Sequence, residues 1–279
     1  MELLDGKVVK KQILEELKQE VEKLERKPGL VVIQVGEDPA SKVYVGQKEK
    51  MASAVGFQYE HLKLKENVTQ EKIEREIKKR NKDNSVDGIL VQMPLPKHLD
   101  SKKIQNLIDS KKDVDGLSDI NSGKLTHNVD CLEPCTPKGI MEILEYYKIP
   151  VEGKNVVIVG RSDLVGKPLA SMMLNHNATV TIAHSKTQNL KEVTKQADIL
   201  VAAVGKKGLI TEDMVKEGSV IIDVGINRVE DKLYGDVDFD GVKDKVSYIT
   251  PVPGGVGQMT VACLGKNVLK AYRLREEMK

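Results

Sequence analysis

The sequence predicts an α/β fold with two domains, and three observations lead to this prediction. Short apolar runs alternate with stretches of helical periodicity through the first part of the chain, the order that forms a parallel sheet covered by helices. Residues 111–137 interrupt this order with many Asp, Gly, Asn and Pro residues and little periodicity. We interpret them as a long functional loop that leads to a domain boundary. A strand, turn, helix and strand then follow between residues 156 and 185.

The first domain is predicted from its periodicity and its helix signals. Apolar residues recur at helical spacing over residues 6–24, with charges on the other face. Asp38 and Pro39 then mark a helix start as N-cap and first helical residue, and Gly56 is placed to end that helix. The other elements expected here are strands at 30–35, 59–64 and 88–91 and helices at 69–80 and 101–110.

The second domain is predicted to open with a helix that starts at Pro137 or Lys138 and ends near Tyr147. Short runs rich in β-branched residues follow, which is typical of buried parallel strands. These strands are expected at residues 156–159, 179–183, 199–203, 220–224 and 248–249, and a last helix at 260–275. The sequence alone does not show which domain the last helix packs against.

Composition excludes several classes of protein. The net charge is only +2 and aromatic residues make up 3% of the chain, without Trp, so no nucleic-acid partner is expected. The sequence lacks a run of about 18 apolar residues and a signal-peptide pattern, so no membrane span is expected. The odd number of cysteines, at 131, 135 and 263, is typical of a reducing cytoplasm. Because Cys131 and Cys135 lack companion ligands in the sequence, no metal is expected either.

Residues 156–185 have the layout of a mononucleotide-binding βαβ unit, which places a phosphate at the helix N-terminus. The turn is Gly-Arg-Ser-x-x-Val-Gly rather than Gly-x-Gly-x-x-Gly. The second strand ends without the acidic residue that would hold a ribose 2′-hydroxyl. Arg161 in the turn and Ser185 after that strand suit a 2′-phosphate better, so the segment favours NADP. Taken singly, Arg161 is equally suited to a surface ion pair and Ser185 to a turn cap.

Three polar residues of the first domain are candidates for chemistry. Tyr44 and Lys48 lie four residues apart on one predicted helix, so they share a face. A lysine beside a tyrosine hydroxyl can transfer protons if desolvation lowers its pKa, although a solvated surface pair is the commoner outcome of this spacing. Gln92 follows a predicted parallel strand at its carboxyl end, where ligands bind in open α/β sheets. A loop-capping role is the alternative for Gln92.

Two loops carry further candidates. Asp113 and Asp115 place two carboxylates in an irregular segment, where they either hold a ligand amidine or cap turns. A metal site would need more oxygen ligands than this spacing supplies. Residues 250–257, Thr-Pro-Val-Pro-Gly-Gly-Val-Gly, form a stiff and then permissive loop. Such a loop either lets the backbone approach a flat ligand closely or makes a tight connection.

Eight segments taken together resemble one family, in the family's order and over nearly the whole chain. This family is the bifunctional methylenetetrahydrofolate dehydrogenase/methenyltetrahydrofolate cyclohydrolase. The segments are Tyr44–Lys48 (YVGQK), Gly88–Pro96 (GILVQMPLP), Lys112–Gly116 (KDVDG), Pro134–Gly139 (PCTPKG), Gly160–Ser162 (GRS), His184–Thr187 (HSKT), Asp223–Asn227 (DVGIN) and Pro251–Gly257 (PVPGGVG).

The resemblance implies two α/β domains flanking a cleft, the second a Rossmann-like nucleotide-binding domain. Residues 1–136 with 260–279 would form the catalytic, folate-binding domain and residues 137–259 the NADP-binding domain. The assembly would be a homodimer built through the nucleotide domain. Methylenetetrahydrofolate would be oxidised by hydride transfer to NADP, and the methenyl product would be hydrolysed to 10-formyltetrahydrofolate.

The resemblance also implies roles for single residues. Lys48 matches the family's catalytic lysine, needed chiefly for hydrolysis, and Gln92 would help set its protonation state. Tyr44 would stack on the pterin, and Asp115 would hold the pterin's amino-pyrimidine edge. All four are therefore expected to bind substrate as well. The remaining expected contacts are Gly160, Arg161, Ser162, Ser185 and Ile226 to the nucleotide and Pro253, Gly254 and Gly255 to the aminobenzoyl part of folate.

The chain departs from the family pattern at two places. Gln258 replaces a proline in the loop before the last helix, so we expect that loop to be looser. Ser118-Asp119 replaces the commoner His-Pro. Three alternative functions stay open beside the bifunctional enzyme. They are an enzyme that has lost one activity, a nucleotide-sensing binding protein, and an oxidoreductase similar to shikimate dehydrogenase.

Overall fold

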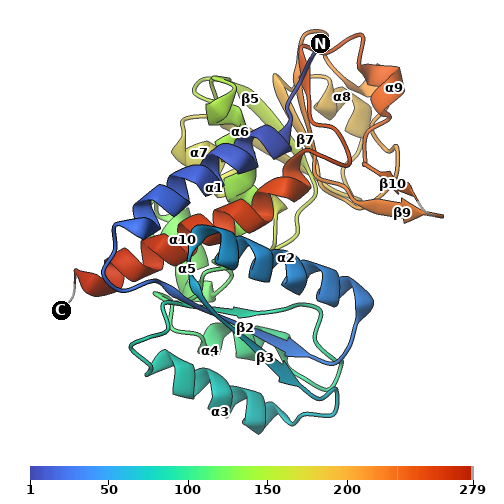
Figure 1. Ribbon diagram of the computed structural model, residues 1–279. Helices are drawn as coiled ribbons and strands as arrows, with labels where there is room; N and C mark the ends of the chain where they lie inside the picture. Colours follow the sequence, from blue (N-terminus) through green and yellow to red (C-terminus); the bar gives the residue numbers. More distant parts are fainter. Residues whose placement is uncertain (231, 278–279) are drawn as a thin grey trace. The chain divides into compact units, whose positions relative to one another are not determined.

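The computed structural model describes residues 1–230 and 232–277, and the chain divides into two compact units (Figure 1). We call residues 12–135 with 261–279 the three-stranded unit, and residues 1–11 with 136–260 the six-stranded unit. The α/β fold with parallel sheets is therefore confirmed. Residues 1–11, expected in the first domain, group here with the six-stranded unit. The exact domain bounds stay a prediction.

The three-stranded unit is a parallel sheet of order β3-β2-β4 with helices packed against it. All seven residues of its central strand are buried, because helices cover both faces of a parallel sheet. Ile73 and Ile77 of α3 and Ile104 of α4 pack on one face within a single apolar cluster. The elements are β2 (Gly29–Val35), α2 (Pro39–Val55), β3 (Gln58–Leu64), α3 (Gln70–Asn81), β4 (Gly88–Val91), α4 (Ser101–Leu107) and α5 (Asp119–Thr126).

Two long helices belong partly to each unit. Helix α1 (Gly6–Glu22) starts in the six-stranded unit, and α10 (Met259–Glu276) begins at its last residues. Residues 261–276 of α10 lie in the three-stranded unit. There Gly265 faces Leu17 and Met51 so closely that a Cβ would lie 2.8 Å from Leu17 Cδ1. The last helix therefore returns to the three-stranded unit.

The predicted helix signals at α2 are confirmed. Asp38 Oδ2 accepts a hydrogen bond from the backbone N of Ser41 at 2.7 Å, as an N-cap does. Gly56 follows the last turn with φ of 85°, a left-handed conformation that only glycine adopts without strain. Lys48 and Tyr44 thus lie on a helix whose two ends are fixed by the sequence itself.

The expectation of one continuous loop at residues 111–137 was wrong in its middle. Residues Asp119–Thr126 form α5, although the segment DINSGKLT is too polar to show helical periodicity. Ser118 Oγ caps it by accepting from the backbone N of Asn121 at 3.3 Å. Leu125 and Asn121 are its buried residues. The departure at Ser118-Asp119 therefore still supports a helix start.

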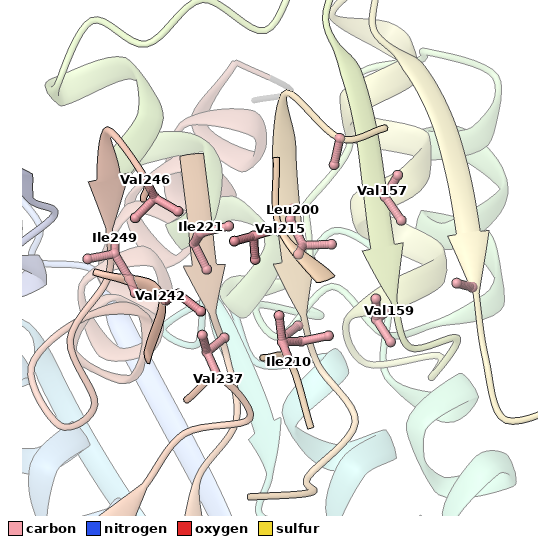
Figure 2. Packing of buried hydrophobic residues seen from close by; sticks show 13 residues of the cluster. Val157, Val159, Leu200, Ile210, Val215, Ile221, Val237, Val242, Val246 and Ile249 are labelled. Atoms are coloured by element: carbon pink, nitrogen blue, oxygen red, sulfur yellow. The ribbon is translucent and has the colours of Figure 1, made fainter. Parts of the chain in front are cut away.

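The six-stranded unit is a parallel sheet of order β1-β11-β8-β7-β5-β6. Side chains from neighbouring strands meet in one core, with Val157 on β5, Leu200 on β7 and Ile221 on β8 (Figure 2). Its elements are β1 (Glu2–Leu3), α6 (Cys135–Tyr146), β5 (Asn155–Val159), α7 (Gly166–Asn175), β6 (Thr179–Ala183), α8 (Leu190–Thr194), β7 (Ile199–Ala202), η1 (Glu212–Met214), β8 (Val220–Asp223), β9 (Asn227–Val229), β10 (Lys232–Tyr234), α9 (Phe239–Val242), β11 (Tyr248–Ile249) and η2 (Val256–Gln258).

The strand order reverses at β5. The chain passes from β5 to β6 on one side and then to β7 on the other. At such a switch point the loops that follow the two central strands diverge, and ligands bind between them at the carboxyl ends of the strands. The loops after β5 and β7 begin at Gly160 and Ala203. The fold therefore predicts a ligand site between these two loops.

Within residues 1–230 and 232–277, no helix is long and apolar enough to cross a membrane.

Candidate active site

Lys48 lies on α2 with its ammonium group inside the three-stranded unit. Its residue exposure is 8%, and Nζ donates a hydrogen bond to Gln92 Oε1 at 2.6 Å. Burial lowers the pKa of Lys48, while the nearby Asp115 carboxylate opposes that shift. The spacing of Tyr44 and Lys48 most often indicates a solvated surface pair, yet Lys48 is buried and has a defined acceptor.

Gln92 is held in place by the strand that precedes it. Its backbone N donates to Ile33 O at 2.8 Å, which extends the pairing of β4 with β2 by one residue. The side-chain Nε2 donates to Met93 O at 2.7 Å. Because the amide nitrogen is used locally, Oε1 is directed at Lys48. Gln92 therefore links the carboxyl end of β4 to α2.

The two carboxylates at 113 and 115 have different roles. Asp113 is buried and accepts from Ser118 N at 2.8 Å and Asn121 Nδ2 at 2.9 Å, so it caps the turn before α5. Asp115 is half-buried and interacts electrostatically with Lys48. Burial raises the pKa of Asp115, and Lys48 opposes the rise. The structure thus brings Lys48, Gln92 and Asp115 together.

Cys135 belongs to the same group, although the sequence suggested no role for it beyond a metal site that lacks further ligands. Its Sγ lies 3.4 Å from Val114 O, and its thiol interacts with both Asp115 and Lys48. The signal in the sequence is its place in Pro134–Gly139, at the end of the loop that carries Asp115.

Tyr44, one turn before Lys48 on α2, is 43% exposed. A tyrosine ring at the surface beside a buried lysine is accessible to a flat ligand.

The glycine turn of the six-stranded unit is shaped by close backbone packing. Gly160 has φ of 135°, and a Cβ there would lie 2.3 Å from Ala203 O. A Cβ on Gly166 would lie 2.2 Å from Gly160 O. Only glycine fits either position, so the turn after β5 can pass directly into α7. The residues present fit a dinucleotide, because this cradle leaves the backbone bare where a pyrophosphate would approach.

The other predicted nucleotide contacts are all exposed. Arg161 and Ser162 lie in the turn, Ser185 follows β6 and Ile226 follows β8. Ser162 Oγ accepts from Val165 N at 3.1 Å, which closes the turn. In the part of the chain that the structure describes, the Arg161 guanidinium has no ion-pair partner. The alternative of a surface ion pair is therefore not seen for Arg161.

The loop with Pro253, Gly254 and Gly255 lies in the six-stranded unit, so the structure does not group it with Lys48. Gly254 has φ of 120°, and Gly255 N donates to Pro251 O at 2.8 Å. A Cβ on Gly6 would lie 2.2 Å from Gly255 O, so the start of α1 packs directly on this backbone. Part of the glycine content thus serves a tight connection.

Both halves of the chain match models of one family. Residues 4–115 match the catalytic domain of tetrahydrofolate dehydrogenase/cyclohydrolase, and residues 134–276 match its NAD(P)-binding domain. The chain belongs to the tetrahydrofolate dehydrogenase/cyclohydrolase family. This family is the one that the eight sequence segments resemble.

Similar family members are known from several organisms. The bifunctional protein FolD of Nitratiruptor sp. is 51% identical, and the match covers 99% of each chain. The bifunctional methylenetetrahydrofolate dehydrogenase/cyclohydrolase of Campylobacter jejuni is 47% identical with a TM-score of 0.97, again over 99% of each chain. The Trypanosoma brucei enzyme, solved with NADP cofactor and inhibitor, is 39% identical with a TM-score of 0.94 and covers 99% of this chain and 98% of its own.

The likeness to shikimate dehydrogenase is one of fold alone. The Thermus thermophilus enzyme is 12% identical with a TM-score of 0.53, over 88% of this chain and 99% of its own. Membership of the tetrahydrofolate dehydrogenase/cyclohydrolase family replaces the shikimate-dehydrogenase-like alternative.

Among the described residues, no group of three or more His, Cys, Asp or Glu side chains is arranged to hold a metal ion.

Proposed function

We propose that this protein oxidises 5,10-methylenetetrahydrofolate with NADP and hydrolyses the resulting 5,10-methenyltetrahydrofolate to 10-formyltetrahydrofolate. The observation that carries the proposal is the buried Lys48–Gln92 pair beside Asp115 in a chain that matches both domains of the family. A binding protein without catalysis would not need a lysine kept inside a desolvated site. The bifunctional FolD protein of Nitratiruptor sp. and the bifunctional enzyme of Campylobacter jejuni support both activities.

The hydrolytic step depends on the protonation state of Lys48. Because burial lowers its pKa, the amine is available in the neutral form to take a proton from water. The oxygen of that water forms a bond to the cationic methenyl carbon, which gives a neutral carbinolamine. The bond between this carbon and N5 of the folate then breaks as the hydroxyl becomes the formyl carbonyl and releases its proton to solvent. The proton accepted by Lys48 passes to the departing N5. Gln92 Oε1 holds the Lys48 amine in place throughout.

Asp115 and Tyr44 are proposed to hold the pterin. A carboxylate accepts paired N–H donors of the amino-pyrimidine edge, and an exposed aromatic ring offers a stacking surface. Asp113, only two residues away, is occupied with the turn before α5 and is not assigned to substrate. The loop Pro253–Gly255 is proposed to contact the aminobenzoyl part, with Gly254 as the position of closest approach.

The six-stranded unit is proposed to bind NADP, which when bound accepts the hydride from the folate. Gly160 lets the backbone approach the pyrophosphate, and Ser162 shapes the turn through its bond to Val165 N. Arg161 and Ser185 are proposed to contact the 2′-phosphate, and Ile226 to contact the nucleotide through its exposed side chain. Hydride transfer needs no acid or base on the carbon, so these residues act by positioning.

We also propose that the protein is a homodimer built through the six-stranded unit. Among the described strands, β6 pairs with β5 alone and so leaves one edge unpaired. Ile182 on β6 and Leu174 on the preceding helix α7 are both exposed apolar residues. An unpaired edge beside exposed apolar side chains is typical of a surface that another chain covers. A cytoplasmic location stays a prediction.

One absorbance experiment tests both activities. Purified protein is mixed with 5,10-methylenetetrahydrofolate and either NADP or NAD, with a blank that lacks protein. We expect a methenyl signal that forms faster with NADP and then decays faster than in the blank. A signal that never forms would refute the dehydrogenase, and a signal that decays only at the blank rate would refute the cyclohydrolase.

A further inference from the structure

Two aspartates and two glycines interlock at the carboxyl end of the six-stranded sheet. Asp223 and Gly225 lie at the end of β8, and Gly235 and Asp236 follow β10. A Cβ on Gly225 would lie 2.2 Å from Asp236 Oδ1, and a Cβ on Gly235 would lie 1.8 Å from Asp223 Oδ2. Each glycine therefore makes room for the carboxylate of the other segment. We call these four residues the Asp–Gly clasp.

The Asp223 carboxylate joins the two segments. It accepts from the backbone N of Gly225 at 3.0 Å, of Asp236 at 2.9 Å and of Val237 at 2.9 Å. Its own backbone N donates to Thr250 Oγ1 at 2.7 Å. Three N–H donors satisfy this buried group, so Asp223 explains why the motif Asp223–Asn227 carries an acid that the nucleotide contacts do not use.

The Asp236 carboxylate reaches a third segment, the loop after β7. It accepts from the backbone N of Val204 at 2.7 Å, of Gly205 at 2.9 Å and of Lys206 at 2.7 Å. Asn227 Nδ2 adds a fourth bond at 2.9 Å. Asp236 is fully buried, so these bonds are shielded from water. One carboxylate thus fixes the conformation of three consecutive residues.

That loop lies beside the glycine turn, at the point where the strand order reverses. Ala203 O lies so close to Gly160 that no side chain fits there, so the loop after β7 runs directly beside the glycine turn. Val204 is 39% exposed although it is apolar. An exposed apolar residue beside the glycine turn at a switch point is placed to contact a dinucleotide.

We propose that Asp236 is a positioning residue for NADP, which acts by holding residues 204–206 so that Val204 contacts the bound nucleotide. The inference rests on the proposed NADP site. It concerns the nucleotide alone, because Asp236 and every group that it contacts lie in the six-stranded unit, whereas Lys48 and Asp115 lie in the other.

The test compares Asp236→Asn with Asp238→Asn. The first replaces an acceptor of four hydrogen bonds by a group with one oxygen and two N–H donors. The second alters the exposed N-cap of α9, which among the described residues accepts only from Gly241 N. For Asp236→Asn we expect the KM and Kd for NADP to rise about tenfold or more, with cyclohydrolase kcat/KM on methenyltetrahydrofolate unchanged. Asp238→Asn is expected to match the wild type in both. Equal loss of both activities in Asp236→Asn would overturn the inference, as would an unchanged Kd.

A surface variant keeps the inference testable if Asp236→Asn does not fold. Val204→Glu leaves the clasp intact and changes only an exposed side chain. We expect direct titration with NADP to show at least a tenfold weaker Kd, because a carboxylate would face the dinucleotide phosphates; an unchanged Kd would overturn the inference. These titrations need no folate. A wild type that binds NADP but does not oxidise methylenetetrahydrofolate would refute the proposed function and leave the inference to be decided by the Kd values.

Discussion

Lys48 Nζ donates a hydrogen bond of 2.6 Å to Gln92 Oε1, and both side chains are buried. The amide is a neutral acceptor, so it orients the amine without adding a negative charge that would stabilise the ammonium form. Desolvation therefore lowers the pKa of Lys48, and Gln92 does not add to the opposing effect of Asp115. The pair is consistent with a lysine whose pKa lies below its ordinary value of about 10.4, which favours the neutral amine that acts as a base.

Changing the charge of residue 92 is expected to shift the pH dependence of hydrolysis. In Gln92→Glu a carboxylate would stabilise the ammonium form and raise the pKa of Lys48. Since the neutral amine is the active base, activity rises as pH passes the pKa of Lys48, and this limb should move to higher pH. At any pH below this limb, a rise of one in the pKa of Lys48 predicts about a tenfold loss of activity. Gln92→Met, of similar length and neutral, should not move the limb upward. The same limb in both variants would contradict this role.

The two carboxylates of the 113–115 segment should respond differently to the same change. Asp115→Asn is expected to raise the KM for methylenetetrahydrofolate about 10- to 100-fold with little effect on thermal stability. Asp113→Asn breaks the cap before α5 and should instead lower the free energy of unfolding by about 1–3 kcal/mol. Steady-state kinetics and thermal unfolding of both variants separate the two roles. A stability loss in Asp115→Asn without a change in KM would show that Asp115 is structural.

Arg161→Ala tests the choice of cofactor. The exposed guanidinium has no ion-pair partner within residues 1–230 and 232–277, so its removal should not disturb the fold. We expect the KM for NADP to rise about tenfold and the KM for NAD to change less than twofold. Lys167→Ala, which removes an exposed cation that pairs with Asp163, is a matched control. Equal changes in the KM for both cofactors would remove the 2′-phosphate argument.

Periodicity predicted the elements that position both candidate sites. The strands at 88–91 and 156–159 lie where the apolar runs indicated, because buried parallel strands need continuous apolar sequence. The strand at 179–183 also lies where it was predicted, although it is an edge strand and mostly exposed. Helix α5 was missed because its hydrogen bonds and caps come from polar residues, which carry no periodic signal. The short antiparallel pair β9 and β10 was missed because most of its residues are exposed, so it has no buried apolar run to indicate a strand.

Side-chain roles depend on contacts that spacing does not encode. Asp113 and Asp115 look equivalent in the sequence, and the hydrogen bonds from Ser118 N and Asn121 Nδ2 assign the turn to Asp113. Residue 258 is a similar case. Its backbone N, which the family's proline lacks, donates to Gly255 O at 3.0 Å, so the gained N–H closes η2. The expectation of a looser loop there stays a prediction.

The most direct test of the central claim is the decay of 5,10-methenyltetrahydrofolate absorbance with Lys48→Met. The methionine fills much of the same space but cannot take a proton, so we expect at least a 100-fold loss of hydrolysis, with the Kd for NADP unchanged. Lys50→Met, an exposed lysine on the same helix, should retain wild-type rates. Hydrolysis by Lys48→Met at the wild-type rate would show that Lys48 is not the base.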